Sequence, residues 1–299
     1  MLRGGLIGCG DVTRTHLSEW ERVDGAQMVA ACDLNMERAR ELAAEHGIPD
    51  VYRNHKELLE KADIDFVDIA TPTDSHLPIV RDAAAAGCHV LCQKPIAQTL
   101  EDLDAMDTAC REAGVRFMVN ENYRFQPWFR RMKELIEGGA IGDPFYARFY
   151  IHGRHSLPEF YFAEQTELFS GMERLILFEV GVHYLDTMRY LLGEPRALFA
   201  SANKVSPHAK GEDSAVVLVQ YPHASALVDS SWASLSDDTP SEPVSDQTYV
   251  VEGSAGTLHL DYNATLNLLT DTGRSSEQFG ADGPQLGFGN AFEHFVQGV

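Results

Sequence analysis

An acidic and an imidazole side chain lie close together in an otherwise apolar stretch of the sequence. Glu179 and His183 are four residues apart, within a segment from Leu175 to Leu192 that has the composition of a buried helix. On a helix this spacing places the two side chains on one face. Such groups are costly to bury unless they are paired or used in chemistry. The pair therefore indicates either a core histidine that is hydrogen-bonded to Glu179 or an acid–base site.

The elements upstream of this pair predict how it is positioned. Strand-like segments alternate with helical ones, and the strands are expected at residues 4–8, 27–32, 64–70, 89–92 and 115–119. This alternation is typical of a doubly wound parallel sheet with right-handed crossovers. From Arg196 onward strands dominate and turn residues separate them, which predicts an antiparallel, meandering sheet.

The turn after the first strand carries a nucleotide-binding signal. Gly8 and Gly10 follow that strand and precede a helix, and Asp33 ends the next strand. Glycines there allow backbone to approach a pyrophosphate, which the helix N-terminus stabilises. The Asp33 carboxylate can bind ribose hydroxyls and opposes a 2′-phosphate, so NAD is favoured over NADP. Thr13 stands where a third glycine or an alanine is usual, so the helix and strand are expected to pack less closely.

Two further loops leave the carboxyl ends of strands, where sheets of this type bind ligands. One runs from Thr71 to His76, and it borders the nicotinamide, caps the next helix, or does both. The other is Gln93-Lys94-Pro95. An isolated lysine is usually solvated, but this position at the edge of a cofactor sheet favours a functional role. The proline at position 95 is compatible with a cis bond.

Five motifs occur in one order along the chain: Gly8-Cys9-Gly10, Asp33, Ala70-Thr71-Pro72, Lys94-Pro95 and Glu179-x-Gly181-x-His183-x-x-Asp186. In this order and spacing the sequence resembles the Gfo/Idh/MocA family, which includes glucose–fructose oxidoreductase and inositol dehydrogenase. The resemblance implies an α/β fold with an N-terminal Rossmann domain and a C-terminal α/β domain with a large, mostly antiparallel open sheet. It also implies hydride transfer between a sugar or cyclitol hydroxyl and NAD(P).

Carried over residue by residue, the resemblance assigns a catalytic lysine to Lys94 and the acid–base role to His183. Glu179 stands where the family has Asp, and its longer side chain either orients the substrate or contacts Lys94. Gln93 replaces the glutamate of a Glu-Lys-Pro motif, which removes a charge beside the lysine. The expected cofactor contacts are Gly8, Gly10, Asp11, Val12, Asp33, Thr71, Pro72, His76, Gln93 and Lys94.

The domain boundary and the substrate side are predicted as follows. Residues 1–122 are expected to form the dinucleotide-binding domain, and residues 123–299 the substrate-binding and oligomerisation domain. Related chains usually continue with another helix or strand, which is compatible with truncation of this chain at Val299. Substrate contacts are expected from Tyr123, Arg124, Arg154 and Phe162, the last two in a polar-aromatic loop. For Tyr123 and Arg124, interdomain packing is the alternative.

Composition restricts the class of partner. The net charge of −21 opposes binding to nucleic acid or to an anionic membrane. Five cysteines lie within the first 110 residues without metal-type spacing, which predicts reduced core thiols, no metal site and a cytoplasmic protein. The start of the chain runs straight into a strand pattern, so no signal peptide is expected.

Several readings remain open from the sequence. The first is a sugar or cyclitol dehydrogenase. The second is a glycosidase of the same fold that retains NAD and oxidises its substrate transiently. The third is a non-catalytic dinucleotide-binding regulator, which the presence of both Lys94 and His183 disfavours. One face of the C-terminal sheet needs cover, so a homodimer or homotetramer through that sheet is expected.

Overall fold

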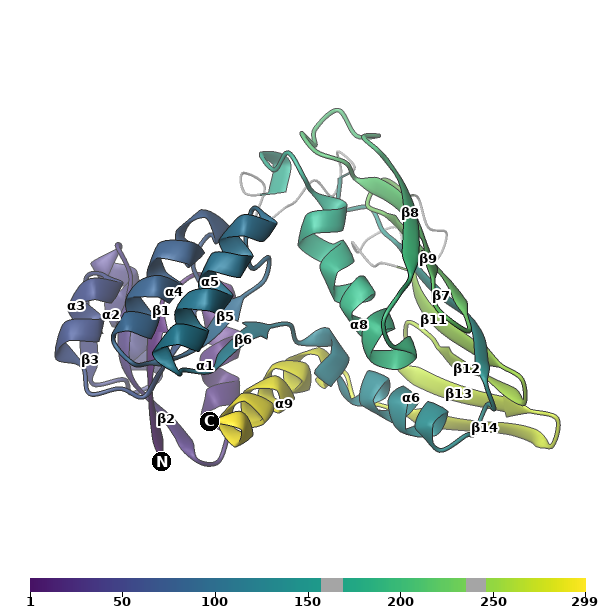
Figure 1. Ribbon diagram of the computed structural model, residues 1–299, viewed down its shortest axis with the longest axis horizontal. Helices are drawn as coiled ribbons and strands as arrows, with labels where there is room; N and C mark the ends of the chain where they lie inside the picture. The colour runs from purple at the N-terminus through teal and green to yellow at the C-terminus, as the bar shows by residue number, and fades with distance from the viewer. Residues whose placement is uncertain (157–168, 235–245) are drawn as a thin grey trace. The chain divides into compact units, whose positions relative to one another are not determined.

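Alternating strands and helices build the first of two units in the computed structural model, which describes residues 1–156, 169–234 and 246–299. This first unit comprises Met1–Phe125 and Pro284–Val299, and the second comprises Gln126–Gly283 (Figure 1). The expected boundary after residue 122 lies three residues from the observed division. The C-terminal segment, expected in the second domain, instead packs within the first unit.

The first unit contains a six-stranded sheet in which all neighbouring strands are parallel, in the order β3-β2-β1-β4-β5-β6. The strands are β1 (Leu2–Ile7), β2 (Ala26–Cys32), β3 (Asp50–Tyr52), β4 (Phe66–Ile69), β5 (His89–Gln93) and β6 (Phe117–Asn120). The strand order reverses between β1 and β4. Sheets of this kind bind ligands outside the carboxyl ends of their strands at that reversal.

Helices cover both faces of this sheet. They are α1 (Val12–Trp20), α2 (Met36–Glu45), α3 (His55–Lys61), α4 (His76–Ala85), α5 (Leu100–Ala113) and α9 (Gly283–Gly298), with short 3₁₀ turns η1 (Thr73–Ser75) and η2 (Tyr123–Phe125). One core cluster joins the sheet to α1, α2 and α9, and a second joins it to α3, α4 and α5. Side chains of Asn35, Asn54 and Thr99 cap α2, α3 and α5.

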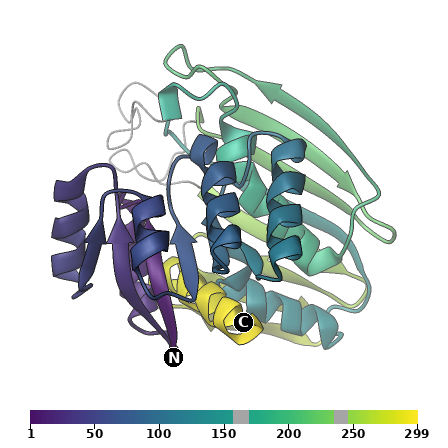
Figure 2. The same ribbon diagram turned by 60° about the vertical axis from the view of Figure 1, so that its left-hand side comes forward.

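Helix α9 completes the first core cluster although it comes from the far end of the chain. The Phe292 ring stacks on Trp20 with 4.3 Å between ring centroids, and Phe295 meets the edge of Phe66. All four rings are buried. Figure 2 shows this helix, coloured yellow, beside the first strands of the chain. The apolar side chains of α9 therefore explain why the C-terminal segment belongs to the first unit.

The second unit contains an eight-stranded sheet in the order β14-β13-β12-β11-β7-β10-β9-β8. Its strands are β7 (Pro144–His152), β8 (Ala197–Asn203), β9 (Ser214–Gln220), β10 (Ser225–Ser231), β11 (Asp246–Gly253), β12 (Gly256–Leu260), β13 (Thr265–Thr270) and β14 (Gly273–Gln278). All neighbours are antiparallel except β7 and β10, which are parallel. The expected mostly antiparallel sheet is thus confirmed.

Helical elements lie on one face of this sheet: α6 (Pro127–Glu137), η3 (Ile176–Gly181) and α8 (Val182–Leu192) (Figure 1). Phe129 of α6 packs against Phe149 and meets the edge of Tyr249, with 5.0 Å between the latter ring centroids. Among the described elements, no helix is seen on the other face. None of the helices within the described ranges is long and apolar enough to cross a membrane.

Candidate active site

The turn after β1 runs closely against the end of β4. Gly8 has a φ of +95°, and a Cβ built on it would lie 2.5 Å from the carbonyl oxygen of Ala70. Glycine adopts this backbone region without steric cost, and the contact leaves no room for a side chain. Gly8 therefore holds the ends of the two strands that flank the reversal of the sheet.

The turn at the start of α1 leaves open space beside Gly10. A Cβ on Gly10 would meet nothing within 4 Å. Asp11 makes no side-chain cap, and the first turn of α1 contains no acidic residue. The first amides of a helix have no partners inside the helix and attract anions. This open cradle fits the pyrophosphate of a dinucleotide.

Thr13 occupies the third fingerprint position without leaving an unsatisfied group. The side chain is fully buried, and its Oγ1 donates a 2.5 Å hydrogen bond to the Gly10 carbonyl. The hydroxyl thus helps to fix the turn at Gly10. This hydrogen bond explains how a threonine can be buried at this position.

Two backbone amides fix the Asp33 carboxylate at the end of β2. Oδ2 accepts a 2.8 Å hydrogen bond from the Cys9 amide, and Oδ1 accepts one of the same length from Asn35. A carboxylate oxygen has more than one acceptor site, so both oxygens can still accept hydroxyl hydrogen bonds. Burial, and then the nearby Asp33 charge, raise the pKa of the Cys9 thiol to about 12, so this thiol stays protonated.

His76 joins the loops that follow β4 and β5. Its Nε2 lies 2.8 Å from the Thr71 carbonyl oxygen, and its Nδ1 lies 3.0 Å from that of Ile96. Burial lowers the pKa of this imidazole, against the two carbonyl groups that favour its charged form. Because the ring is fully buried and both nitrogens face backbone, the geometry favours a loop-bridging role. Direct contact of His76 with a cofactor stays a prediction.

Lys94 follows β5 and is partly buried. The Lys94–Pro95 peptide bond is cis, as the sequence had allowed. The Gln93 side chain turns back on this junction, because its Oε1 accepts a 2.7 Å hydrogen bond from the Lys94 amide. The structure thus brings Gly8, Gly10, Asp33, Thr71, Pro72, Gln93 and Lys94 to the carboxyl ends of β1, β2, β4 and β5.

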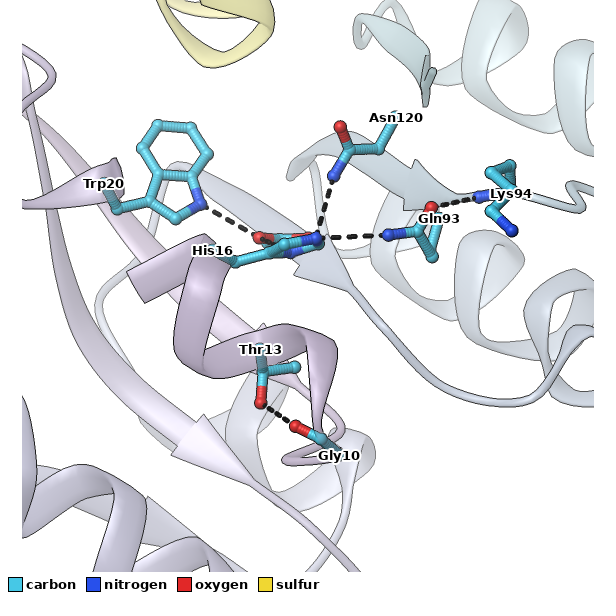
Figure 3. Close-up of polar contacts among 8 residues, drawn as sticks. Gly10, Thr13, His16, Trp20, Gln93, Lys94 and Asn120 are labelled. Atoms are coloured by element: carbon cyan, nitrogen blue, oxygen red, sulfur yellow. Dashed lines mark hydrogen bonds and ion pairs between the residues drawn. The ribbon is translucent and has the colours of Figure 1, made fainter. Parts of the chain in front are cut away.

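Sequence reasoning missed a buried polar group beneath Lys94. His16 of α1 lies between Trp20, Asn120 and Gln93 (Figure 3), and its Nδ1 is 3.0 Å from Asp68 Oδ2. The available signal was Asp68, an acidic residue inside the apolar strand from Phe66 to Ile69. A carboxylate in a strand buried on both faces requires donors from the covering helices.

In the second unit, Glu179 lies on a π-helix and His183 on the α-helix that continues from it. Glu179 is partly buried and His183 is buried. The segment is helical as expected, but its first part is wider than an α-helix. The expectation that Glu179 and His183 share one face by α-helical spacing therefore does not apply directly. Single π-helical turns are frequent at functional sites.

Glu212 holds the start of this π-helix. Its Oε1 accepts hydrogen bonds from the amides of Leu175 and Leu177 at 3.0 and 3.2 Å. Its backbone carbonyl also accepts from the Ile176 amide at 2.9 Å. A carboxylate at a helix N-terminus accepts hydrogen bonds from the amides that have no partner inside the helix. Its negative charge is also stabilised by the positive end of the helix dipole. Glu212 is a second site-supporting residue that sequence reasoning missed.

The predicted substrate contacts that the structure describes come from both units. Tyr123 and Arg124 form η2, which belongs to the first unit rather than the domain expected from residue 123 onward. Arg154 follows β7 in the second unit and is partly buried. Phe162 lies outside the described residues. Within the described ranges, no cluster of three or more His, Cys, Asp and Glu side chains could hold a metal ion.

All five cysteines are buried and free, as expected for core thiols. Burial is the largest cause that raises the thiol pKa in each, to about 12 at Cys32 and about 11 at Cys110. Thiolates are therefore scarce at neutral pH, which makes these residues poor nucleophiles and metal ligands.

The sequence and the fold are similar to those of known oxidoreductases. The chain is 39% identical to a D-apiose dehydrogenase of Paraburkholderia graminis over 274 residues, which covers 89% of this chain and 69% of that protein. It is 28% identical to a myo-inositol 2-dehydrogenase of Thermotoga maritima, with 90% and 78% covered.

Solved structures agree with this. An oxidoreductase from Agrobacterium radiobacter, in complex with NAD⁺, L-tartaric acid and magnesium, matches with a TM-score of 0.89 and 30% identity, covering 99% of this chain and 87% of that one. Residues 2–121 match the model of an oxidoreductase family with an NAD-binding Rossmann fold, and residues 129–259 match the GFO/IDH/MocA C-terminal domain. The chain therefore belongs to the GFO/IDH/MocA family of oxidoreductases.

Proposed function

We propose that this protein is an NAD-dependent dehydrogenase that acts on a CH–OH group of a sugar or cyclitol. The observation that carries the proposal is the open cradle at Gly10, at the same sheet edge as Lys94. The similarity to a D-apiose dehydrogenase and a myo-inositol 2-dehydrogenase supports the substrate class. The names of several similar proteins give a sugar or a cyclitol as the substrate. This favours a substrate rich in hydroxyl groups.

NAD is the preferred cofactor in this proposal, and when bound it accepts hydride from the carbon that carries the reacting hydroxyl. The amides of the α1 start and of the turn at Gly10 hold the pyrophosphate. Asp33 accepts hydrogen bonds from the adenosine ribose hydroxyls and repels a 2′-phosphate. Asp11, Val12, Thr71 and Pro72 line the cofactor path.

The proton of the hydroxyl must leave as the hydride leaves. His183 accepts this proton, since imidazole exchanges protons near neutral pH. Lys94 donates a hydrogen bond to the reacting oxygen. Glu179 orients the substrate from the π-helix. Tyr123, Arg124, Arg154 and Phe162 supply contacts to the remaining hydroxyls and ring faces. The buried thiols favour a reducing compartment such as the cytoplasm.

The test is NADH formation by the purified protein with NAD and a panel that includes D-apiose and myo-inositol. We expect turnover with at least one sugar or cyclitol, and a loss of kcat by roughly 100-fold or more for Lys94→Met and His183→Ala. Release of an aglycone from a glycoside without net NADH would instead support the retained-NAD glycosidase. Undiminished turnover by His183→Ala would refute the role of His183.

The exposed face of the eight-stranded sheet supports self-association. Phe199 of β8 pairs across the sheet with Leu218 of β9, and the two side chains are 69% and 48% exposed. Val216 on the same face of β9 is 42% exposed. We expect a second copy to cover this apolar face in a homodimer or homotetramer. Light scattering that shows only a monomer would refute this, and Phe199→Glu should dissociate the oligomer.

A further inference from the structure

A buried hydrogen-bonded chain begins at Asp68, in the middle of the first unit. Asp68 and His16 are both 0% exposed. Asp68 Oδ2 lies 3.0 Å from His16 Nδ1 and accepts a 2.9 Å hydrogen bond from Trp20 Nε1. A carboxylate can only accept, so the His16 proton sits on Nδ1. The remaining ring nitrogen, Nε2, is then an acceptor.

The chain continues from His16 to the backbone of Lys94. Gln93 Nε2 lies 3.1 Å from His16 Nε2, and Gln93 Oε1 accepts from the Lys94 amide at 2.7 Å. Each link pairs one donor with one acceptor. A reversed Gln93 amide would set its oxygen against the His16 lone pair and its NH₂ against the Lys94 N–H. The hydrogen bonds therefore fix a single orientation of Gln93.

Aromatic rings enclose the imidazole in the middle of this chain. The Phe288 and Phe292 rings of α9 lie 5.0 and 5.4 Å from the His16 ring, between centroids. Asn120 Nδ2 also points at His16 Nε2, at a longer 3.4 Å. The low polarity of this setting strengthens each hydrogen bond and penalises any unpaired group. The position of Gln93 is therefore restrained by the buried residues around His16.

We propose that Asp68, His16 and Gln93 are positioning residues for Lys94. Their hydrogen-bonded chain fixes the position of the lysine backbone at the end of β5. The proposal rests on the function proposed above, in which Lys94 contacts the reacting oxygen. It also explains why glutamine replaces the glutamate expected from the family motif. A glutamate would offer His16 Nε2 no donor, so the ring would need a proton on each nitrogen to bond both Asp68 and the second carboxylate.

Two substitutions separate the links of the chain. Gln93→Leu has a similar volume and removes both hydrogen bonds of the side chain. Gln93→Glu keeps an acceptor for the Lys94 amide but sets a carboxylate against His16 Nε2. Asn120→Leu is the matched control, because Asn120 is buried and touches the same His16 nitrogen from β6, whereas the Lys94 amide donates to Gln93. It perturbs the same core while leaving the Gln93 link intact.

The first measurement needs no substrate. Competitive acetylation by acetic anhydride, read by mass spectrometry, compares the reactivity of the Lys94 amine with that of the exposed Lys56 in the same full-length protein. We expect Gln93→Leu to change the Lys94 rate relative to Lys56, and Asn120→Leu to leave that ratio unchanged. Equal ratios in wild type and Gln93→Leu would overturn the proposal, whatever the thermal stability of the variants.

The second measurement reads the proton on His16. In ¹⁵N-histidine-labelled protein, the wild-type ring should show the neutral Nδ1–H tautomer. In Gln93→Glu it should show protons on both nitrogens, because the new carboxylate needs a donor. A ring that keeps the wild-type signature in Gln93→Glu, or that is the Nε2–H tautomer in wild type, would overturn the proposed direction of the chain.

The third measurement uses turnover. For the sugar that wild type oxidises, kcat of Gln93→Leu should fall by up to about 100-fold, as expected for a displaced catalytic group. Asn120→Leu should retain kcat within about twofold, since it leaves the lysine in place. Equal losses in both variants would indicate a purely structural role. If wild type oxidises no sugar but the Lys94 labelling still shifts, the proposed function fails while the positioning link stands.

Discussion

Asp33 Oδ2 accepts a 2.8 Å hydrogen bond from the Cys9 amide, and this joins the end of β2 to the turn between β1 and α1. The residue expected to bind ribose thereby also fixes the loop expected to bind pyrophosphate. Two parts of the cofactor site are held in register by one side chain, before any ligand is present. Substitutions at Asp33 should therefore act on cofactor choice and on loop order together.

Replacing Asp33 by Ser should reduce the preference for NAD over NADP. The serine hydroxyl can still accept a ribose hydrogen bond, but the negative charge that opposes a 2′-phosphate is lost. We expect the ratio of the two Kd values, measured by calorimetry, to fall by roughly tenfold or more, or about 1.4 kcal/mol. Asp24→Ser is a control of equal charge in the exposed turn before β2 and should leave the ratio unchanged.

Gly10→Ala and Gly8→Ala should behave differently although the two glycines share one turn. At Gly10 a Cβ meets no protein atom, so stability should be retained while NAD binding weakens by roughly tenfold. At Gly8 the positive φ and the Ala70 carbonyl oppose a Cβ, which should lower the free energy of unfolding by about 1–2 kcal/mol. Urea unfolding and NAD titration of both variants check this pair. Equal NAD affinity in Gly10→Ala and wild type would contradict a pyrophosphate at the cradle.

Removing the Glu212 side chain should loosen the π-helix that carries Glu179. Glu212→Ala leaves the amides of Leu175 and Leu177 without their acceptor, and loss of such a cap costs about 1 kcal/mol. We expect a lower urea midpoint and a reduced kcat. The matched control is Glu173→Ala, which removes an exposed carboxylate paired with Lys210. If both variants lose the same activity, the cap has no bearing on the site.

Acidification should destabilise the protein partly through His155. Burial lowers the pKa of this imidazole below its ordinary value of 6.5, so the unfolded chain binds a proton more readily than the folded one. The contribution of His155 to stability is full above pH 6.5 and declines as the pH falls below that value. His155→Phe, which keeps an aromatic ring beside Trp232, should make unfolding less pH-dependent between pH 7.5 and 5.5. An unchanged pH dependence in urea unfolding would contradict this assignment.

Most of the fold could be predicted because its strands and helices carry strong apolar patterns. Two strands, β3 and β14, were not predicted. β3 has only three residues, Asp50–Tyr52, and is too short to show alternation. β14, Gly273–Gln278, is exposed throughout, so it has no apolar face to detect. In both cases pairing with a neighbouring strand, rather than intrinsic pattern, determines the conformation.

The candidate site could be predicted where chemistry is local in sequence. Gly8, Gly10 and Asp33 lie in one strand–turn–helix–strand segment, and its pattern indicated a nucleotide site. His16, Asp68 and Gln93 are far apart along the chain, so only the packing of α1 on the sheet brings them together. The π-helix at Glu179 was equally hidden, because its apolar composition also suits an α-helix.

The stacked pair of Trp20 and Phe292 joins residues that are synthesised at very different times, because Phe292 belongs to the C-terminal helix α9. During translation, residues 1–125 leave the ribosome long before Phe292 is made, and residues 126–283 emerge in between. Until then the apolar side of β1 and α1 lacks its cover, and the imidazole of His16 lacks its two aromatic neighbours. The nascent nucleotide-binding half should therefore reach its final state only after the other half has been synthesised. A fragment of residues 1–125 expressed alone is then expected to need a chaperone, or α9 added in trans, to stay folded.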